Sequence, residues 1–260
     1  MSIRPKQSLG QNFLHDPNIV RKIVDAVRAP ADGHVVEIGA GQGALTGELL
    51  ERFATFTAFE IDERAVAYLR GEFPDLDVRE RDILQLDWAS LAEEKGAPIY
   101  VVGNLPYNIT SQILFDLIDA RTIVREAVVM MQLEVAERLV AEPRTKAYGI
   151  LSVQLQTFTE PELLFKVSPN VFFPRPDVHS AMVRLRLRGD DSMLDDVDPE
   201  FLRDVIRTAF NQRRKTLRNS LGRWTRGMGI ELEGDLEGRR AEELTPPEFV
   251  ALARYLESRS

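Results

Sequence analysis

Four adjacent residues offer the clearest chemistry in this chain: Asn104, Leu105, Pro106 and Tyr107, which follow the short apolar run 99–103. They place an amide, a rigid turn and an aromatic ring at the expected end of a strand. The Asn104 side-chain oxygen and the Leu105 carbonyl, placed by Pro106, can accept the two hydrogens of an exocyclic amine. Tyr107 offers a ring on which a flat base can stack. These residues predict a pocket for an amine-bearing base.

Adenine N6 is an amine that such a pocket would suit. It is a poor nucleophile because its lone pair is delocalised into the ring. Two acceptors favour a tetrahedral nitrogen with a directed lone pair, so positioning and electrostatics can act without a strong general base. A base inside a helix must be extruded, and a second aromatic wall helps to hold it. Phe172 is our candidate for that wall; the alternative is a core aromatic before a proline turn.

A glycine loop, Gly-Ala-Gly-Gln-Gly at 39–43, follows the apolar run 35–38 and precedes a helical pattern. Glycine tolerates positive φ and lets the backbone approach a ligand closely. The spacing is GxGxG and position 44 is alanine, whereas the dinucleotide fingerprint is GxGxxG. We expect Gly39 and Gly41 to contact a nucleoside cofactor; the alternative is a tight turn without a ligand.

Acidic residues follow the next two predicted strands. Glu60, with Ile61 after it, ends one strand, and Asp82 and Ile83 follow the other. Ligands of open α/β sheets collect at the carboxyl ends of the strands, so the recurrence of acids there favours a shared ligand. We expect Glu60 to accept the hydroxyl hydrogens of a ribose. Asp82 can bond an adenine amine while Ile83 covers the ring.

The glycine loop, Glu60 and Asp82 together resemble the first three motifs of class I S-adenosylmethionine-dependent methyltransferases. The resemblance implies that Gly39 and Gly41 line the methionine portion of S-adenosylmethionine. It also implies that Glu60 holds the ribose and Asp82 the adenine. With the pocket at Asn104, the expected reaction is methyl transfer to an exocyclic amine.

The elements that must position these residues alternate between apolar runs and helical patterns up to residue 188. This rhythm predicts an α/β fold, a Rossmann-like, mostly parallel seven-stranded sheet with helices on both faces. The expected strands are 34–38, 55–60, 76–80, 99–103 and 127–132, with a late hairpin of 163–167 and 180–188. The expected helices are 44–52, 63–73, 111–120, 134–141 and 150–158.

The chain should form two domains. We expect a methyltransferase domain at 1–188, whose residues 1–30 close the cofactor site, a linker at 189–199 that is acidic and rich in turn formers, and a small all-helical domain at 200–260 that ends in a helix near 247–256. No cysteine is present, and the spacing of His15, His34 and His179 is not that of metal ligands, so we expect no metal. No apolar run approaches a membrane span, and we expect a cytoplasmic protein without a membrane partner.

Basic residues are concentrated between 203 and 226, where eight face a single acid, although the whole chain has a net charge of −8. On one helix, Arg203, Arg207, Arg214 and Arg218 would fall within about 60° of one another. This predicts a basic helix face, including Lys215, that contacts RNA phosphates. The alternative is the solvated face of an amphipathic helix.

Five separated motifs together closely resemble the KsgA family: 8–14, 104–107, 131–139, 172–181 and 210–219. The resemblance implies S-adenosylmethionine-dependent dimethylation of N6 of two neighbouring adenines in the 3′-terminal hairpin of 16S, small-subunit, ribosomal RNA. It implies the 30S subunit as partner, a role in its biogenesis, and a monomer by default. It also implies that Asn12 and Leu14 help close the cofactor site, beside Gly39, Glu60, Asp82 and Asn104.

Two other functions stay open at this stage. A related adenine dimethyltransferase that acts on 23S, large-subunit, ribosomal RNA would share the cofactor site and the pocket. A ribosome-assembly factor that mainly binds would need neither, yet Asn104, Tyr107, Glu60 and Asp82 are all present. DNA adenine and protein glutamine methyltransferases usually carry proline where Leu105 stands.

Overall fold

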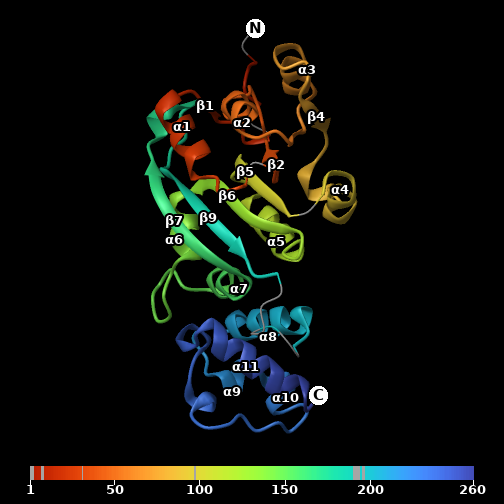
Figure 1. Ribbon diagram of the computed structural model, residues 1–260. Coiled ribbons are helices and arrows are strands. Elements are labelled where there is room, and N and C mark those ends of the chain that lie inside the picture. Colours follow the sequence, from red (N-terminus) through yellow and green to blue (C-terminus); the bar gives the residue numbers. More distant parts are fainter. Residues whose placement is uncertain (1–2, 7–8, 31, 97, 190–193, 195–196) are drawn as a thin grey trace. The chain divides into compact units, whose positions relative to one another are not determined.

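The computed structural model describes residues 3–6, 9–30, 32–96, 98–189, 194 and 197–260 (Figure 1). The chain folds into two compact units, one of 1–136 with 160–189 and one of 137–159 with 190–260. This grouping differs from the expected boundaries, because 137–159 belongs with the C-terminal helices. The reason is helix α7 (Ile150–Phe158), which is largely buried and packs with α8 (Pro199–Asn211) and α11 (Pro246–Glu257). Most of the expected linker, 189–199, lies outside the described residues.

The first unit is built on a seven-stranded sheet in the order β4-β3-β2-β5-β6-β9-β7. Four neighbouring pairs, from β4 to β6, are parallel, and β9 is antiparallel to β6. The predicted fold class and all seven predicted strands are confirmed, with ends that differ by a few residues. The strands are β2 (His34–Ile38), β3 (Phe56–Glu60), β4 (Asp77–Glu80), β5 (Ile99–Asn104), β6 (Val124–Gln132), β7 (Thr159–Val167) and β9 (Ser180–Leu187).

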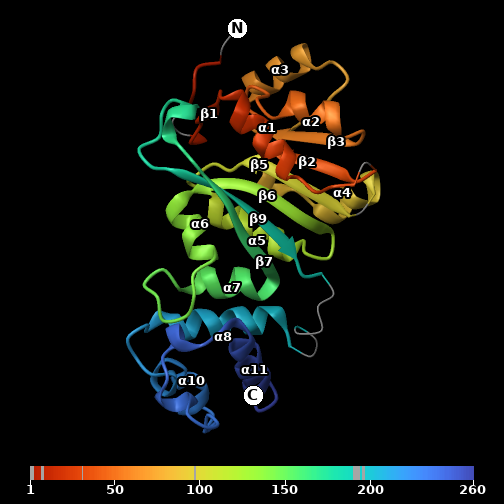
Figure 2. The same ribbon diagram turned by 60° about the vertical axis from the view of Figure 1, so that its left-hand side comes forward.

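Helices cover both faces of this sheet (Figure 2). Successive strand side chains point to opposite faces, so Val35 and Val102 pack under α1, α2 and α3, while their neighbours Val36 and Val101 point to the face of α4 and α5. Both sets of strand valines are buried, which gives the sheet a core on each side. The helices are α1 (Pro17–Ala26), α2 (Thr46–Arg52), α3 (Glu63–Glu72), α4 (Trp88–Lys95), α5 (Thr110–Asp119) and α6 (Leu133–Leu139).

Helices α1 and α4 are absent from the sequence prediction although each begins with a recognisable signal. Asp16 caps α1 by accepting from the N–H groups of Asn18 and Ile19, and Pro17 opens the helix. Asp87 caps α4 in the same way. In both cases an aspartate precedes an apolar pattern by one turn, which is a signal that the sequence already contains.

A two-stranded antiparallel ribbon was also not predicted. Strand β1 (Phe13–Leu14) pairs with β8 (Phe172–Phe173), with Phe13 opposite Phe173 and Leu14 opposite Phe172. Facing residues of such a pair lie on the same side of the ribbon. Leu14 and Phe172 are therefore both turned into the core, whereas Phe173 is 64% exposed.

The second unit is all-helical, as predicted. It contains α7, α8, α9 (Leu217–Ser220), α10 (Gly222–Thr225) and α11, with two short 3-10 turns at Leu236–Gly238 and Ala241–Glu243. The expectation that one helix carries the basic face is wrong. Helix α8 ends at Asn211, and the Lys215 N–H donates to the Gln212 carbonyl in the turn that follows. Thr216 then forms a bridge with Arg240, so Arg214 and Arg218 lie outside the helix of Arg203 and Arg207.

Within the described ranges, the structure contains no helix long and apolar enough to cross a membrane.

Candidate active site

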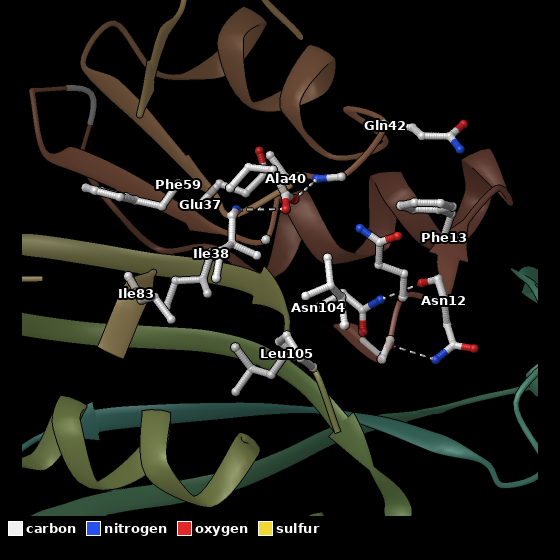
Figure 3. Close-up of a pocket in the computed structure, with 18 of the residues that line it drawn as sticks. Asn12, Phe13, Glu37, Ile38, Ala40, Gln42, Phe59, Ile83, Asn104 and Leu105 are labelled. Carbon is white, nitrogen blue, oxygen red and sulfur yellow. Dashed lines mark hydrogen bonds between the residues drawn. The ribbon is translucent and has the colours of Figure 1, made fainter. Parts of the chain in front are cut away.

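A pocket enclosing about 1000 Å³, partly open to solvent, lies at the carboxyl ends of β2, β3 and β5 (Figure 3). The strand order reverses between β2 and β5, and open α/β sheets bind ligands at such a switch point. Every cofactor residue expected from the sequence lines this pocket: Asn12, Leu14, Gly39, Gly41, Glu60, Ile61, Asp82, Ile83 and Asn104. Leu105, Pro106 and Tyr107 also line it.

The glycine loop forms one wall, and its backbone requires glycine. Gly39 and Gly41 have φ of 71° and 55°, in the left-handed region that side chains with a Cβ disfavour. A Cβ on Gly41 would also lie 3.0 Å from the Phe13 ring. The Gly41 N–H donates to Glu60 at 2.8 Å, which ties the loop to the end of β3.

Glu60 is buried, and its carboxylate already accepts three backbone N–H groups. Oε2 accepts from Gly41, while Oε1 accepts from Ile61 and Asp62 at 2.9 Å each. A carboxylate has about four acceptor sites, so the second site of Oε2 remains for a ligand hydroxyl. The expected role of Glu60 toward the hydroxyls of a ribose stays a prediction. Ile61, 50% exposed, lies at the rim.

Asp82 begins the 3-10 turn Ile83–Gln85 by accepting from the Leu84 N–H through Oδ1 at 3.0 Å. Ile83 is buried in the wall beside it. An acceptor and an apolar side chain in adjacent positions suit the amine and the face of an adenine ring. These two residues, with the glycine loop and Glu60, fit a nucleoside cofactor.

Asn104 is the side chain at the end of β5 whose amide enters the pocket (Figure 3). Its Nδ2 donates to the Asn12 carbonyl at 3.0 Å. Its Oδ1 is buried and, among the described residues, has no hydrogen-bond partner. Burying an amide oxygen without a partner costs about 1–3 kcal/mol, so this atom is an unfilled acceptor on a residue of the pocket wall.

Tyr107 also lies in the pocket wall. Its hydroxyl hydrogen-bonds to Ser180 Oγ at 2.7 Å, at the start of β9. Burial raises the pKa of Tyr107 above its usual value, so the phenol remains neutral and the ring keeps its stacking face. Leu105 is fully buried, with its N–H bonded to the Met130 carbonyl, and it fixes the turn that carries Tyr107.

Glu37 is a site residue that the sequence analysis did not identify. It lies within β2, lines the pocket, and is 2% exposed. Thr46 donates its hydroxyl to Oε2 of Glu37 at 2.7 Å. Burial raises the pKa of Glu37 to about 7. The missed signal was a lone acid in an apolar strand, two residues before Gly39, where the glycine loop begins.

Phe172 does not line the pocket. The ribbon of β1 and β8 turns it into the hydrophobic core, where it is 3% exposed. The expectation of a pocket aromatic at this position is therefore corrected: the alternative of a core aromatic describes its place. A two-residue strand shows no periodicity, so the sequence could not tell which of Phe172 and Phe173 points inward.

The basic residues of the second unit differ in how exposed they are. Arg207, Arg214 and Lys215 are exposed, while Arg218 forms an ion pair with Glu237 at 3.3 Å. Arg203 is half-buried, with its guanidinium over the Phe158 ring.

Two further segments of the second unit place cations beside the turn 212–216 that follows α8. Arg213 donates to the Thr145 and Lys146 carbonyls, and Arg240 lies across the bridge from Thr216. We call the exposed cations that result the basic surface: Arg144, Lys146, Arg214, Lys215 and Arg240.

The fold and the pocket define the class. A mostly parallel seven-stranded sheet of this order, with a nucleoside-type pocket at its switch point, is the class I S-adenosylmethionine-dependent methyltransferase fold. Among the residues described, no three His, Cys, Asp or Glu side chains are grouped as for a metal ion.

The chain belongs to the ribosomal RNA adenine dimethylase family, because the sequence model of that family matches residues 3–257. A protein from Salinibacter ruber named Ribosomal RNA small subunit methyltransferase A is 56% identical over 98% of this chain and 86% of its own length. A protein of the same name from Prosthecochloris aestuarii is 48% identical over 96% and 93%.

Two solved structures share the fold. A dimethyladenosine transferase from Plasmodium falciparum superposes with a TM-score of 0.78 at 24% identity and covers 94% of this chain and 96% of that one. The 23S rRNA methyltransferase ErmE superposes with a TM-score of 0.69 at 27% identity and covers 95% and 100%.

Proposed function

We propose that this protein dimethylates N6 of adenine in small-subunit ribosomal RNA, with S-adenosylmethionine as the methyl donor. The observation that carries the proposal is the buried Oδ1 of Asn104, which lacks a partner among the described residues and belongs to a residue that lines the pocket, as Tyr107 does. An exocyclic amine supplies the hydrogen that this oxygen needs.

Different residues would bind the cofactor and the target base. Glu60, Asp82 and the glycine loop would hold the cofactor, which supplies an electrophilic methyl group on a sulfonium when bound. Asn104 Oδ1 and the Leu105 carbonyl would accept the two N6 hydrogens, and this would direct the nitrogen lone pair away from the base ring. Tyr107 would stack on the ring. Each transfer releases one N6 proton to solvent, and no side chain need act as a strong base.

The small subunit is favoured as substrate because relatives that are 48–56% identical carry that name, whereas the 23S enzyme ErmE is 27% identical. We propose that the targets are two adjacent adenines of the 3′-terminal hairpin, presented by the 30S subunit or its precursor in the cytoplasm. The second unit would bind RNA through its basic surface.

The test uses labelled S-adenosylmethionine with separate small and large subunits that lack the modification, followed by mapping of the labelled base. We expect N6,N6-dimethyladenine in small-subunit RNA. Label confined to the large subunit would overturn the choice of substrate.

In the same assay, Asn104→Ala should reduce single-turnover methyl transfer at least 100-fold, because the acceptor for the amine is lost. Binding of the cofactor should remain measurable by calorimetry. An unchanged rate would refute the role of Asn104, and a protein that bound subunits normally without any transfer would instead be an assembly factor.

A further inference from the structure

A buried carboxylate outside the transfer machinery ties the N-terminal segment to the pocket. Asp62 follows Glu60 by two residues, and its side chain is 0% exposed. It accepts from the Arg64 backbone and guanidinium, which belong to the helix that Asp62 caps. It also accepts from Gln11 Nε2 at 3.0 Å and Lys6 Nζ at 3.3 Å, both from the N-terminal segment.

Gln11 is held at both ends of its amide. Its Nε2 donates to Asp62, and its Oε1 accepts from the Lys6 backbone N–H at 2.8 Å. Because each amide atom has a partner of fixed type, the side chain has one orientation. The backbone of residue 11 is therefore fixed relative to β3.

The next residue along the chain is Asn12, whose carbonyl accepts from Asn104 Nδ2. This bond decides which end of the Asn104 amide faces the ligand. With Nδ2 bonded to the Asn12 carbonyl, Oδ1 is the end of the amide that has no partner among the described residues. If the Asn12 carbonyl moved away, the amide could rotate and present a donor to the amine instead of an acceptor.

We propose that Asp62 and Gln11 are positioning residues for methyl transfer: they hold the Asn12 carbonyl against Asn104, and this bond points the Asn104 oxygen at the amine. The inference rests on the proposed function of Asn104 as the acceptor. A displacement of about 1 Å in a catalytic group can cost on the order of 100-fold in rate. Loss of the positioning contacts should therefore lower the rate of methyl transfer at saturating cofactor and RNA.

The alternative is that the N-terminal segment only encloses the pocket and does not orient Asn104, since residues 9–14 line the pocket. Loss of a wall raises KM or the dissociation constant of the cofactor and leaves the saturated rate unchanged. Loss of a positioning contact lowers the saturated rate. The split between kcat and KM therefore separates the two roles.

The test compares two substitutions of Gln11 that differ in whether they can donate to Asp62. Gln11→Glu keeps the size and the acceptor for Lys6 but places a carboxylate against Asp62. It should lower the single-turnover rate at saturation at least tenfold. Gln11→Lys keeps a donor for Asp62 but loses the acceptor for the Lys6 N–H, so it should recover part of the rate that Gln11→Glu loses. Asn18→Asp, an exposed amide-to-carboxylate change on α1, is the matched control and should have no effect.

Asn104→Ala, measured alongside, separates failure of this inference from failure of the proposed function. If it transfers at the native rate, the role of Asn104 is refuted and this inference with it. If it is inactive while Gln11→Glu keeps the native saturated rate, only the positioning role is refuted, including the case in which KM alone rises. If Gln11→Glu does not fold, Gln11→Ala must show the same loss of saturated rate.

Discussion

At the scale of single residues, the three acidic side chains that line the pocket, Glu37, Glu60 and Asp82, have different environments. Glu60 accepts three backbone N–H groups, Asp82 accepts one, and Glu37 accepts a single threonine hydroxyl while being almost fully buried. Backbone donors stabilise a carboxylate, whereas burial with one hydroxyl does not compensate for lost solvation. Glu37 is therefore the acid of this site whose charge responds to pH near neutrality.

This environment predicts how Glu37 affects stability. Its pKa is about 7 in the folded protein and near 4.3 when unfolded. Between these values the folded protein retains a proton that the unfolded chain releases, so the free energy of unfolding should fall as pH rises from about 4.5 to 7 and level off above. Glu37→Gln should lack this decline and exceed the native stability at pH 8 by about 3–4 kcal/mol.

The measurement is urea unfolding at pH 5 and pH 8. Glu48→Gln, exposed on α2, serves as the control and should follow the native profile. Parallel profiles for the native protein and Glu37→Gln would show that Glu37 is not the group responsible.

The remaining acceptor site of Glu60 predicts its contribution to cofactor binding. Replacing Glu60 by Ala removes a charge-assisted hydrogen bond to a hydroxyl, which contributes about 1.5–3 kcal/mol. The dissociation constant of S-adenosylmethionine, measured by calorimetry, should rise roughly 10- to 100-fold. Glu63→Ala, at the exposed first residue of α3, is the control. An unchanged constant in Glu60→Ala would contradict the ribose role.

The sequence predicts Glu60, Asp82 and Asn104 as neighbours because each ends a strand of one parallel sheet, where side chains of different strands meet. It does not predict that the Asn12 carbonyl orients Asn104, because that bond joins residues 92 positions apart. Nor does it predict that Phe172 is buried, because its partner Leu14 is even more remote in the chain.

At the scale of elements, the sequence prediction missed α1 and α4 despite their aspartate caps, and it failed where pairing is non-local or a helix stops. The sheet strands follow from apolar runs. The end of α8 at Asn211 does not, because basic residues continue past it and the turn is stabilised by Thr216 and Arg240, which lie far apart. Local patterns say little about such contacts.

The antiparallel side of the sheet contains a buried ion pair, between β9 and β6, whose removal should destabilise the first unit. Arg184 in β9 is 4% exposed and contacts Glu126 in β6 at 3.3 Å, Glu162 in β7 at 2.8 Å and the Ala26 carbonyl at 2.7 Å. Arg184→Met leaves the buried Glu126 uncompensated, so the free energy of unfolding should fall by about 3–5 kcal/mol.

Arg186, two residues along the same strand, gives the matched control. It is 47% exposed and lies 3.6 Å or more from its acidic partners. Arg186→Met should cost less than about 1 kcal/mol in the same urea unfolding experiment. Equal losses for the two variants would mean that the Arg184 network contributes no more than a surface pair.

At the scale of the whole molecule, the two units carry charge differently. The net charge of the chain is −8, yet the basic surface of the second unit is assembled from the loop 144–146, the turn 212–216 and Arg240. Within the described residues, none of its five cations forms an ion pair with an acid. Acidic proteins repel RNA at long range, so a local, unneutralised cluster is where phosphate contact is favoured.

Charge reversal within that surface gives the prediction for RNA binding. Arg214→Glu with Lys215→Glu should weaken binding of small-subunit RNA at least tenfold at low salt. It should also reduce the slope of log affinity against log salt by about one to two, since each phosphate contact releases about one counterion. Arg28→Glu with Arg125→Glu changes the charge equally on exposed residues of the first unit and should keep the native slope. If both double variants lose affinity equally and their slopes change equally, net charge rather than the basic surface governs RNA binding. If neither slope changes, the phosphates are contacted elsewhere.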